Sequence, residues 1–260
     1  MIFEGLVNKE FWEERHDLVR PKHPFPMPNR YYLDFELDSI FQRYLSNLKN
    51  KDLIEVGCGS SVWLPYFHKE FGLNITGLDY SQKGIAMSRI ILEKNQVKGR
   101  LVEANVFEMS EKNEFLFDVV FSLGFIEHFN DPLMVLTSLK RLLAPNGLLI
   151  TWLPNTKGCI IKLSQHLNSK LQNFYYQMDL GEVLHIHQIC GLDVLESHYT
   201  QFLDFNLITL PRLPKMWLKW IPRLFRGIGL VFIVLGKYFK IQIREKRLSA
   251  GIVVIARRTN

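Results

Sequence analysis

Between residues 52 and 153, short apolar runs alternate with amphipathic stretches, and this alternation restricts the fold more than any other feature of the chain. The apolar runs have the length of single strands and cover residues 52–56, 74–79, 99–104, 117–123 and 147–153. Stretches with helical spacing lie between them at 62–70, 82–94 and 132–143. Apolar strands that alternate with helices are typical of a parallel sheet covered by helices on both faces. We therefore predict an α/β fold with a doubly wound sheet.

Two further strand patterns follow this region, at residues 191–202 and 249–258, after a helical pattern at 179–189. The first of them begins at a glycine, and the second is almost continuously apolar. We therefore expect the core of the fold to comprise residues 51–202 together with 249–260.

Residues 1–50 are expected to form a helical lid or strap outside this core. Helical patterns near 9–19 and 34–48 flank the stretch PKHPFPMPNR at 21–30, which has four prolines in ten residues. Proline lacks a backbone N–H and fixes φ, so this stretch cannot be a regular helix. An ordered strap between two helices is the structure that this pattern favours.

Residues 203–248 are predicted to form a basic, apolar helical insert between the last two strands. The uncharged run at 227–236 is too short for a transmembrane helix, which needs about 20 residues. At 210–240, however, apolar residues recur at helical spacing: Trp217, Trp220, Leu224, Ile228, Val231, Leu235 and Phe239. Tryptophans, basic flanks and such a stripe suit a helix that lies on an anionic membrane surface. Packing on the same domain, or a dimer interface, are the alternatives.

Charge is distributed unevenly along the chain, whose formal net charge is +6. Residues 207–260 contain 12 Lys and Arg but a single acid, Glu245, so this part carries +11 and residues 1–206 carry −5. The basic part indicates either a surface that meets an anionic partner or a solvated face without one. The N-terminus has no secretory signal pattern, and the three cysteines form no disulfide framework. We expect a cytoplasmic protein, with a peripheral position at the inner membrane face as the alternative.

Residues 53–61, LIEVGCGSS, place a glycine turn directly after the first predicted strand. Glycines there let the backbone approach a ligand closely. Dinucleotide-binding turns have the pattern G-x-G-x-x-G, and Val62 occupies the third glycine position here. Glu55, two residues before Gly57, would repel a pyrophosphate but can pair with an ammonium group. The turn therefore favours a cofactor such as S-adenosylmethionine, which has an amino-acid end and no phosphate, over NAD.

With this turn, the sequence resembles the class I S-adenosylmethionine-dependent methyltransferases, of the small-molecule, methyltransferase type 11-like kind. Their first motif is acid-x-Gly-x-Gly-x-Gly, and here it is E-V-G-C-G-S-S with Ser61 at the third glycine. The stretches FDVVFSLGFIEHF and RLLAPNGLLITWLPN resemble the motifs around the fourth and fifth strands. The resemblance covers residues 50–155 best. It implies a Rossmann-like, seven-stranded sheet whose last strand is antiparallel.

The resemblance also implies which residues bind the cofactor: Glu55, Gly57, Cys58, Gly59, Asp79, Tyr80, Asn105, Val106, Ser122 and Leu123. The turn residues and Ser122–Leu123 would meet the methionine part. Asp79 would accept both ribose hydroxyls, and Tyr80 would lie against the adenine. Asn105 stands where the family usually has an acid, and its carbonyl can still accept from the adenine amine, with the next backbone N–H on the ring.

His128 and Glu127 are the candidate catalytic residues, since both follow the fourth strand and an imidazole can act as a general base near neutral pH. A local structural role is the alternative for each. We predict no metal site, because His185, His187 and Cys190 do not supply the four ligands of a closed zinc site. Two tyrosine pairs are candidates for the wall of a substrate pocket, with ordinary packing as the alternative: Tyr31, Tyr32, Tyr175 and Tyr176.

The function expected from these observations is methyl transfer from S-adenosylmethionine to a small-molecule or lipid-linked acceptor, such as a quinone, a lipid or a sugar. An RNA-directed methyltransferase that uses the basic residues for phosphate contacts is one alternative. It is less favoured because residues 122–125 are S-L-G-F and not the Asn/Asp-Pro-Pro-aromatic motif often found in enzymes that methylate amines of proteins and nucleic acids. A catalytically silent partner subunit is the other alternative. The oligomeric state stays open.

Overall fold

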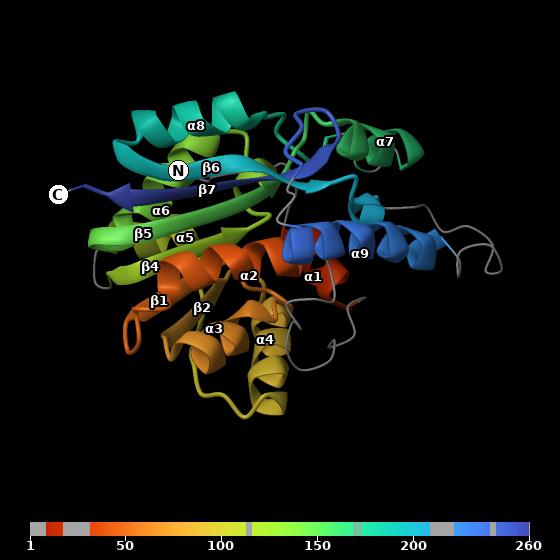
Figure 1. The fold of residues 1–260 in the computed structure, drawn as a ribbon. Coiled ribbons are helices and arrows are strands. Elements are labelled where there is room, and N and C mark those ends of the chain that lie inside the picture. Colours follow the sequence, from red (N-terminus) through yellow and green to blue (C-terminus); the bar gives the residue numbers. More distant parts are fainter. Residues whose placement is uncertain are drawn as a thin grey trace.

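The computed structural model describes residues 9–17, 32–112, 116–168, 171, 173–208, 221–239 and 243–259. These residues form a sheet of seven strands in the order β3-β2-β1-β4-β5-β7-β6 (Figure 1). The strands are β1 Asp52–Val56, β2 Asn74–Asp79, β3 Arg100–Glu103, β4 Phe117–Leu123, β5 Leu143–Pro154, β6 Leu192–Phe202 and β7 Ser249–Arg258. The chain starts at a central strand, moves outward to β3, and then returns past β1 to build the other half.

The predicted sheet direction is confirmed. Pairings among β1 to β5 are parallel, whereas β7 is antiparallel to both of its neighbours, β5 and β6. The strand bounds follow the sequence pattern closely, except that β5 begins at Leu143, before the predicted 147. The sheet is therefore doubly wound and Rossmann-like, with only its last strand reversed.

Helices cover both faces of the sheet (Figure 1). One face carries α2 Tyr32–Leu45, α3 Trp63–Phe71 and α4 Gln82–Lys94, and the other carries α5 Val106–Lys112, α6 Pro132–Arg141 and α8 Leu180–Ile189. Four further elements lie toward the end of the sheet at which the parallel strands terminate: α1 Lys9–Asp17, α7 Cys159–Leu167, α9 Ile221–Phe239 and the short 3-10 helix η3 Phe205–Leu207. A second 3-10 helix, η1 Ile126–His128, follows β4.

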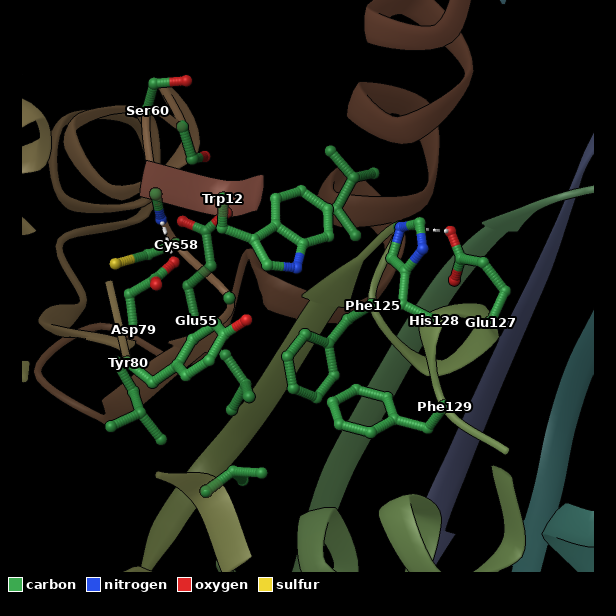
Figure 2. A pocket seen from close by; sticks show the side chains of 18 of the residues that line it. Trp12, Glu55, Cys58, Ser60, Asp79, Tyr80, Phe125, Glu127, His128 and Phe129 are labelled. Carbon is green, nitrogen blue, oxygen red and sulfur yellow. Dashed lines mark hydrogen bonds and ion pairs between the residues drawn. The ribbon is translucent and has the colours of Figure 1, made fainter. Parts of the chain in front are cut away.

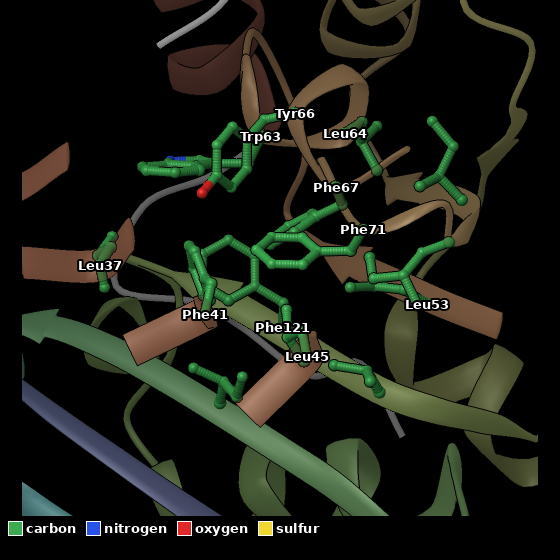
Figure 3. Packing of buried hydrophobic residues seen from close by; sticks show 14 of the residues in the cluster. Leu37, Phe41, Leu45, Leu53, Trp63, Leu64, Tyr66, Phe67, Phe71 and Phe121 are labelled. Carbon is green, nitrogen blue, oxygen red and sulfur yellow. The ribbon is translucent and has the colours of Figure 1, made fainter. Parts of the chain in front are cut away.

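The larger aromatic core lies between the sheet and α2 and α3. Phe41 of α2 makes edge-to-face contacts with Phe67 of α3 and Phe121 of β4, with ring centroids 4.9 and 5.4 Å apart (Figure 3). All three side chains are buried. Edge-to-face pairs add to the free energy gained by burial alone. This packing fixes the start of α3, and with it the turn that follows β1.

The predicted N-terminal lid at residues 1–50 and the predicted insert at 203–248 are only partly described. The proline-rich stretch 21–30 lies outside the described residues, and the division into lid, core and insert stays a prediction. Within the described part, α2 packs in the core through Leu37, Phe41 and Leu45, all fully buried. The helix α9 begins at Ile221, so Pro222 stands at its start, where proline is tolerated. No helix of the described residues is both long enough and apolar enough to cross a bilayer.

Candidate functional site

The glycine turn joins β1 to α3 at the carboxyl end of the sheet. Gly57 has φ +74°, a left-handed conformation that side chains disfavour, and a Cβ there would lie 2.7 Å from a ring carbon of Phe125. The backbone N–H groups of Gly57 and Cys58 both donate to Leu78 O on β2, at 2.8 and 3.1 Å. The turn is therefore held tightly against its neighbouring strand, as a ligand-binding turn must be.

Glu55 lies in the wall of a cavity above this turn, with only 1% of its surface exposed. Its Oε2 has no hydrogen-bond partner among the described residues. Burial raises the pKa of Glu55 to about 8; the Asp79 carboxylate adds to this shift and a hydrogen bond with Ser61 opposes it. A buried carboxyl oxygen without a partner is costly unless a ligand supplies one. The ammonium group of an amino acid would be such a partner.

Asp79 connects the glycine turn to the end of β2. Its Oδ2 accepts a hydrogen bond from the Gly59 N–H at 2.8 Å, and its Oδ1 accepts one from the Ser81 N–H at 2.8 Å. The Asp79 carboxylate lines the same cavity as Glu55. Tyr80, the next residue, also lines the cavity. The structure thus brings together the residues that sequence analysis assigned to the ribose and to the methionine part.

The remaining predicted cofactor residues differ in their positions. Asn105, Val106 and Leu123 line the cavity, as do Cys58 and both turn glycines. Asn105 Oδ1 accepts a hydrogen bond from the Phe107 N–H at 3.0 Å and so caps the start of α5. Ser122 is buried and is not among the cavity-lining residues described. Adjacent strand residues point to opposite faces, which explains why Leu123 lines the cavity and Ser122 does not.

The two candidate catalytic residues lie on η1, at the other end of the same cavity (Figure 2). Nδ1 of His128 lies 3.1 Å from Phe174 O. Because a carbonyl only accepts, a neutral His128 carries its proton on Nδ1 and leaves Nε2 as an acceptor. Nε2 lies 3.6 Å from Glu127 Oε1. Burial raises the pKa of Glu127 to about 8, and its Oε2 has no hydrogen-bond partner among the described residues.

Aromatic side chains surround His128, and two of them, Trp12 and Phe174, were not assigned by sequence analysis. The ring centroids of Trp12 and Phe174 lie 5.0 and 4.5 Å from that of the imidazole, and Tyr175 lies 5.5 Å away. In Figure 2, Trp12 lies between the cofactor residues on one side and His128 on the other, above Phe125 and Phe129. Of the predicted tyrosines, Tyr175 lines the cavity and Tyr176 is 42% exposed. Tyr31 and the Tyr32 side chain lie outside the described part.

Trp12 reaches the cavity because α1 is anchored at the start of α4. Both carboxylate oxygens of Glu13 accept backbone hydrogen bonds, from the Gln82 N–H at 2.9 Å and the Lys83 N–H at 3.1 Å. A carboxylate at a helix N-terminus is stabilised by the unpaired N–H groups and the helix dipole. No sequence pattern near residue 13 indicates this contact, since its partners are remote in the chain.

No metal cluster is found among the described residues, as searched for groups of three or more His, Cys, Asp or Glu side chains. His187 is instead a core residue: Nδ1 lies 2.7 Å from Val183 O and Nε2 3.1 Å from Thr151 Oγ1. Burial lowers its pKa to about 4, so it is neutral. His185 is exposed, and Cys190 packs beside Thr137 of α6.

The cavity as a whole has a volume of about 1170 Å³. This exceeds the range of about 300–1,000 Å³ that is usual for one small-molecule site. Its residues fit S-adenosylmethionine: Glu55 offers an unpartnered oxygen for the ammonium, Asp79 offers oxygens for the ribose, and Tyr80 and Val106 offer apolar surface for the adenine. The space beside His128 is then left for a second molecule.

A family model described as a methyltransferase domain matches residues 30–195. Among curated proteins, the chain is similar to the ubiquinone biosynthesis O-methyltransferases of Vibrio cholerae and Pseudomonas aeruginosa. It is 26% identical to each over 145 residues, which are 56% of this chain and 55% and 57% of those proteins. The chain thus spans about half the length of the curated relatives it matches.

Solved structures share the fold at low sequence identity. Haemonchus contortus phosphoethanolamine N-methyltransferase 2, in complex with S-adenosyl-L-methionine, has a TM-score of 0.56 at 19% identity and covers 87% of this chain and 53% of its own. Synechocystis magnesium protoporphyrin IX methyltransferase, with bound SAH, has a TM-score of 0.58 at 13% identity, with 96% and 94% covered. The [4+2]-cyclase SpnF has a TM-score of 0.65 at 12% identity, with 97% of each chain covered. Because that fold also carries a cyclase, fold alone does not assign a reaction.

Proposed function

Because the chain belongs to the methyltransferase domain family, whose cofactor is S-adenosylmethionine, we propose that it methylates a hydroxyl group on the ring of a small, uncharged acceptor. One observation carries the proposal: a single cavity has Glu55 and Asp79 at one end and His128 within aromatic walls at the other. A ring hydroxyl, as in a quinol, matches those walls. The relatives named for ubiquinone biosynthesis support an acceptor of this class.

The chain's own residues would mainly bind the acceptor, orient it and exclude water from it. S-adenosylmethionine, when bound, supplies a methyl group on a positively charged sulfur, which is already a good electrophile. His128 Nε2 would accept the proton of the acceptor hydroxyl, while the Phe174 carbonyl holds the imidazole in the required tautomer. Trp12 and Phe174 would position the ring and keep water away from it.

The test uses mass spectrometry after incubation with methyl-labelled S-adenosylmethionine and either 4-methylcatechol, a lipid extract or total RNA. We expect labelled O-methyl product from the catechol, and from ring hydroxyls in the extract. His128→Gln should lower the rate at least tenfold while leaving the binding of S-adenosylhomocysteine unchanged, because a positioned base contributes about 10²–10⁴-fold. His185→Gln, an exposed histidine, is the matched control. Label in RNA alone, or cofactor binding with no product from any acceptor, would refute the proposal.

We also propose that α9 rests on an anionic membrane surface from which such an acceptor is taken. Leu230, Val231, Val234 and Tyr238 are 45%, 55%, 46% and 70% exposed and share one side of the helix. This exposed side only partly coincides with the predicted apolar stripe. Within that stripe Val231 and Phe239 are exposed, whereas Leu235 is partly buried. Trp217 and Trp220 lie outside the described residues. The charge of +11 over residues 207–260 complements anionic headgroups.

Flotation with vesicles of phosphatidylglycerol and phosphatidylcholine tests this surface. Val231→Asp with Val234→Asp should abolish flotation, because each places a charge where apolar side chains would enter the lipid. Ile189→Asp is the matched control, since Ile189 is 56% exposed on α8 at the opposite face of the sheet. If the unmodified protein does not float at low salt, the proposal that α9 binds a membrane surface is refuted. A concentration-dependent dimer that the double variant dissociates would also refute it, and would favour a second copy of the chain as the partner of α9. The cellular position at the inner membrane face depends on this result.

A further inference from the structure

One part of the cavity is used neither by the cofactor residues nor by His128. It is lined by Leu33 of α2, Trp63 of α3, Trp152 and Pro154 of β5, Ile161 of α7 and Leu207 of η3. These six residues define what we call the apolar arm. None of them carries a charge, and the indole N–H of Trp152 is already used, because it donates to Thr200 Oγ1 at 3.0 Å. The arm therefore offers hydrocarbon surface and little else.

The strand order separates the β5 residues of the arm from the cofactor strands, whereas Trp63 of α3 follows the cofactor turn itself. The cofactor residues lie at the ends of β1 and β2 and at the start of α5, whereas Trp152 and Pro154 end β5, on the other side of β4. His128 belongs to η1, which follows β4, and β4 is the strand between β1 and β5. A molecule whose ring lies at His128 can thus extend toward Trp152 and Pro154, away from the ends of β1 and β2.

The walls of the arm are fixed by packing. Trp152 is 5% exposed, and a Cβ at Gly251 of β7 would lie 2.6 Å from its ring, so the indole fills the space that this glycine leaves. Ile161 is 1% exposed, and Trp63 makes an edge-to-face contact with Phe41 at 5.3 Å. A preformed apolar wall binds a hydrocarbon chain with little ordering cost.

The outer end of the arm leads to an apolar surface. Leu207 belongs to η3, which contacts both α7 and α9. On α7, Ile161 faces the cavity while Leu163 and Leu167, four residues apart, are 42% and 40% exposed. In Figure 1, α7 and α9 lie at the same end of the molecule. The arm is apolar inside and opens beside helices with exposed apolar residues. It therefore suits a ligand's hydrocarbon chain that passes outward between these helices.

From this arrangement we infer that the apolar arm binds a hydrocarbon chain attached to the acceptor ring. The acceptor class is then an amphiphile: a ring hydroxyl at His128 and an alkyl or isoprenoid chain along Trp152 and Leu207. This inference rests on the proposed function for the position of the ring. The chain would contribute binding free energy in proportion to the apolar area that it buries.

Calorimetry with 4-alkylcatechols of one to eight chain carbons tests the arm without turnover, in the presence of S-adenosylhomocysteine. Each added methylene should tighten binding by up to about fourfold until the arm is filled, after which the affinity levels off. Leu207→Trp, at a partly buried position, should end this gain at a shorter chain and leave 4-methylcatechol binding unchanged. Leu163→Trp, on the exposed side of α7, is the matched control and should behave as the unmodified protein.

The outcomes separate this inference from the proposed function. Methylation of 4-methylcatechol with no dependence of affinity on chain length would overturn the arm and leave the function standing. Chain-length-dependent binding that Leu207→Trp shortens, with no methylation, would support the arm and overturn the function. If Leu207→Trp weakened short and long ligands equally, the residue would affect the ring site and the arm would be refuted. If affinity still increases with chain length in the Val231→Asp, Val234→Asp variant, the result supports binding of the hydrocarbon chain in the apolar arm. If that increase is lost in the variant, the hydrocarbon chain binds at α9 and the inference about the arm is wrong.

Discussion

Proton release on cofactor binding is the sharpest consequence of the buried Glu55. With a pKa of about 8, its carboxyl is almost fully protonated at pH 6.5, whereas pairing with a ligand ammonium requires the carboxylate. S-adenosylhomocysteine carries the same amino-acid end, and its α-amine is protonated at pH 6.5. Binding at pH 6.5 should therefore release about one proton from Glu55. At pH 9 the carboxyl of Glu55 is already mostly ionised before binding, so this proton release should largely disappear.

Calorimetry in buffers of different ionisation enthalpy measures these protons directly. Glu55→Gln should abolish the release at pH 6.5, because an amide does not titrate, and should weaken binding at pH 8 by about 10- to 100-fold, the value of one charge-assisted hydrogen bond. Glu127→Gln is the matched control: Glu127 is equally buried and also has a pKa of about 8, yet lies at the other end of the cavity. If the unmodified protein releases no proton at pH 6.5, or Glu55→Gln releases as many, then Glu55 does not bind the ammonium group.

Three further outcomes follow from single contacts. Gly57→Ala should abolish S-adenosylhomocysteine binding in calorimetry, since its Cβ would clash at 2.7 Å and its φ is +74°, whereas Gly181→Ala, with only a 3.4 Å contact, should bind normally. Thr151→Val should lower the free energy of unfolding by about 1–3 kcal/mol in urea, because buried His187 loses its partner. The raised pKa of Glu127 stabilises the fold fully below about pH 4.5, and this stability is lost as pH rises through about 8. The melting temperature should therefore fall less between pH 5 and 9 in Glu127→Gln than in the unmodified protein; equal slopes would contradict this.

Local patterns sufficed for the half of the site that lies next to the strands. Glu55, Gly57 and Asp79 sit at strand ends, and the carboxyl ends of adjacent parallel strands meet at one edge of a sheet, so their proximity follows from the order of elements. The short helices α5 and η1 were not predicted, because they have too few turns to show a helical period. The helix α7 was not predicted either, although it is as long as α3.

The other half of the site required the tertiary structure. Trp12 and Phe174 meet His128 only because Glu13 anchors α1 on α4 and because the segment before α8 folds back over η1. The sequence around Trp12 and Phe174 does not indicate how close their rings lie to His128, because each contact joins segments that are far apart in the chain.

The sequence by itself therefore determined the alternation of strands and helices and the cofactor turn, because periodicity and glycine chemistry act over a few residues. The reversed last strand followed only from the family resemblance. Only the tertiary structure decided the protonation of Glu55 and Glu127, the tautomer of His128 and the apolar arm. Those properties depend on how much water and which neighbours surround a side chain, and packing sets both.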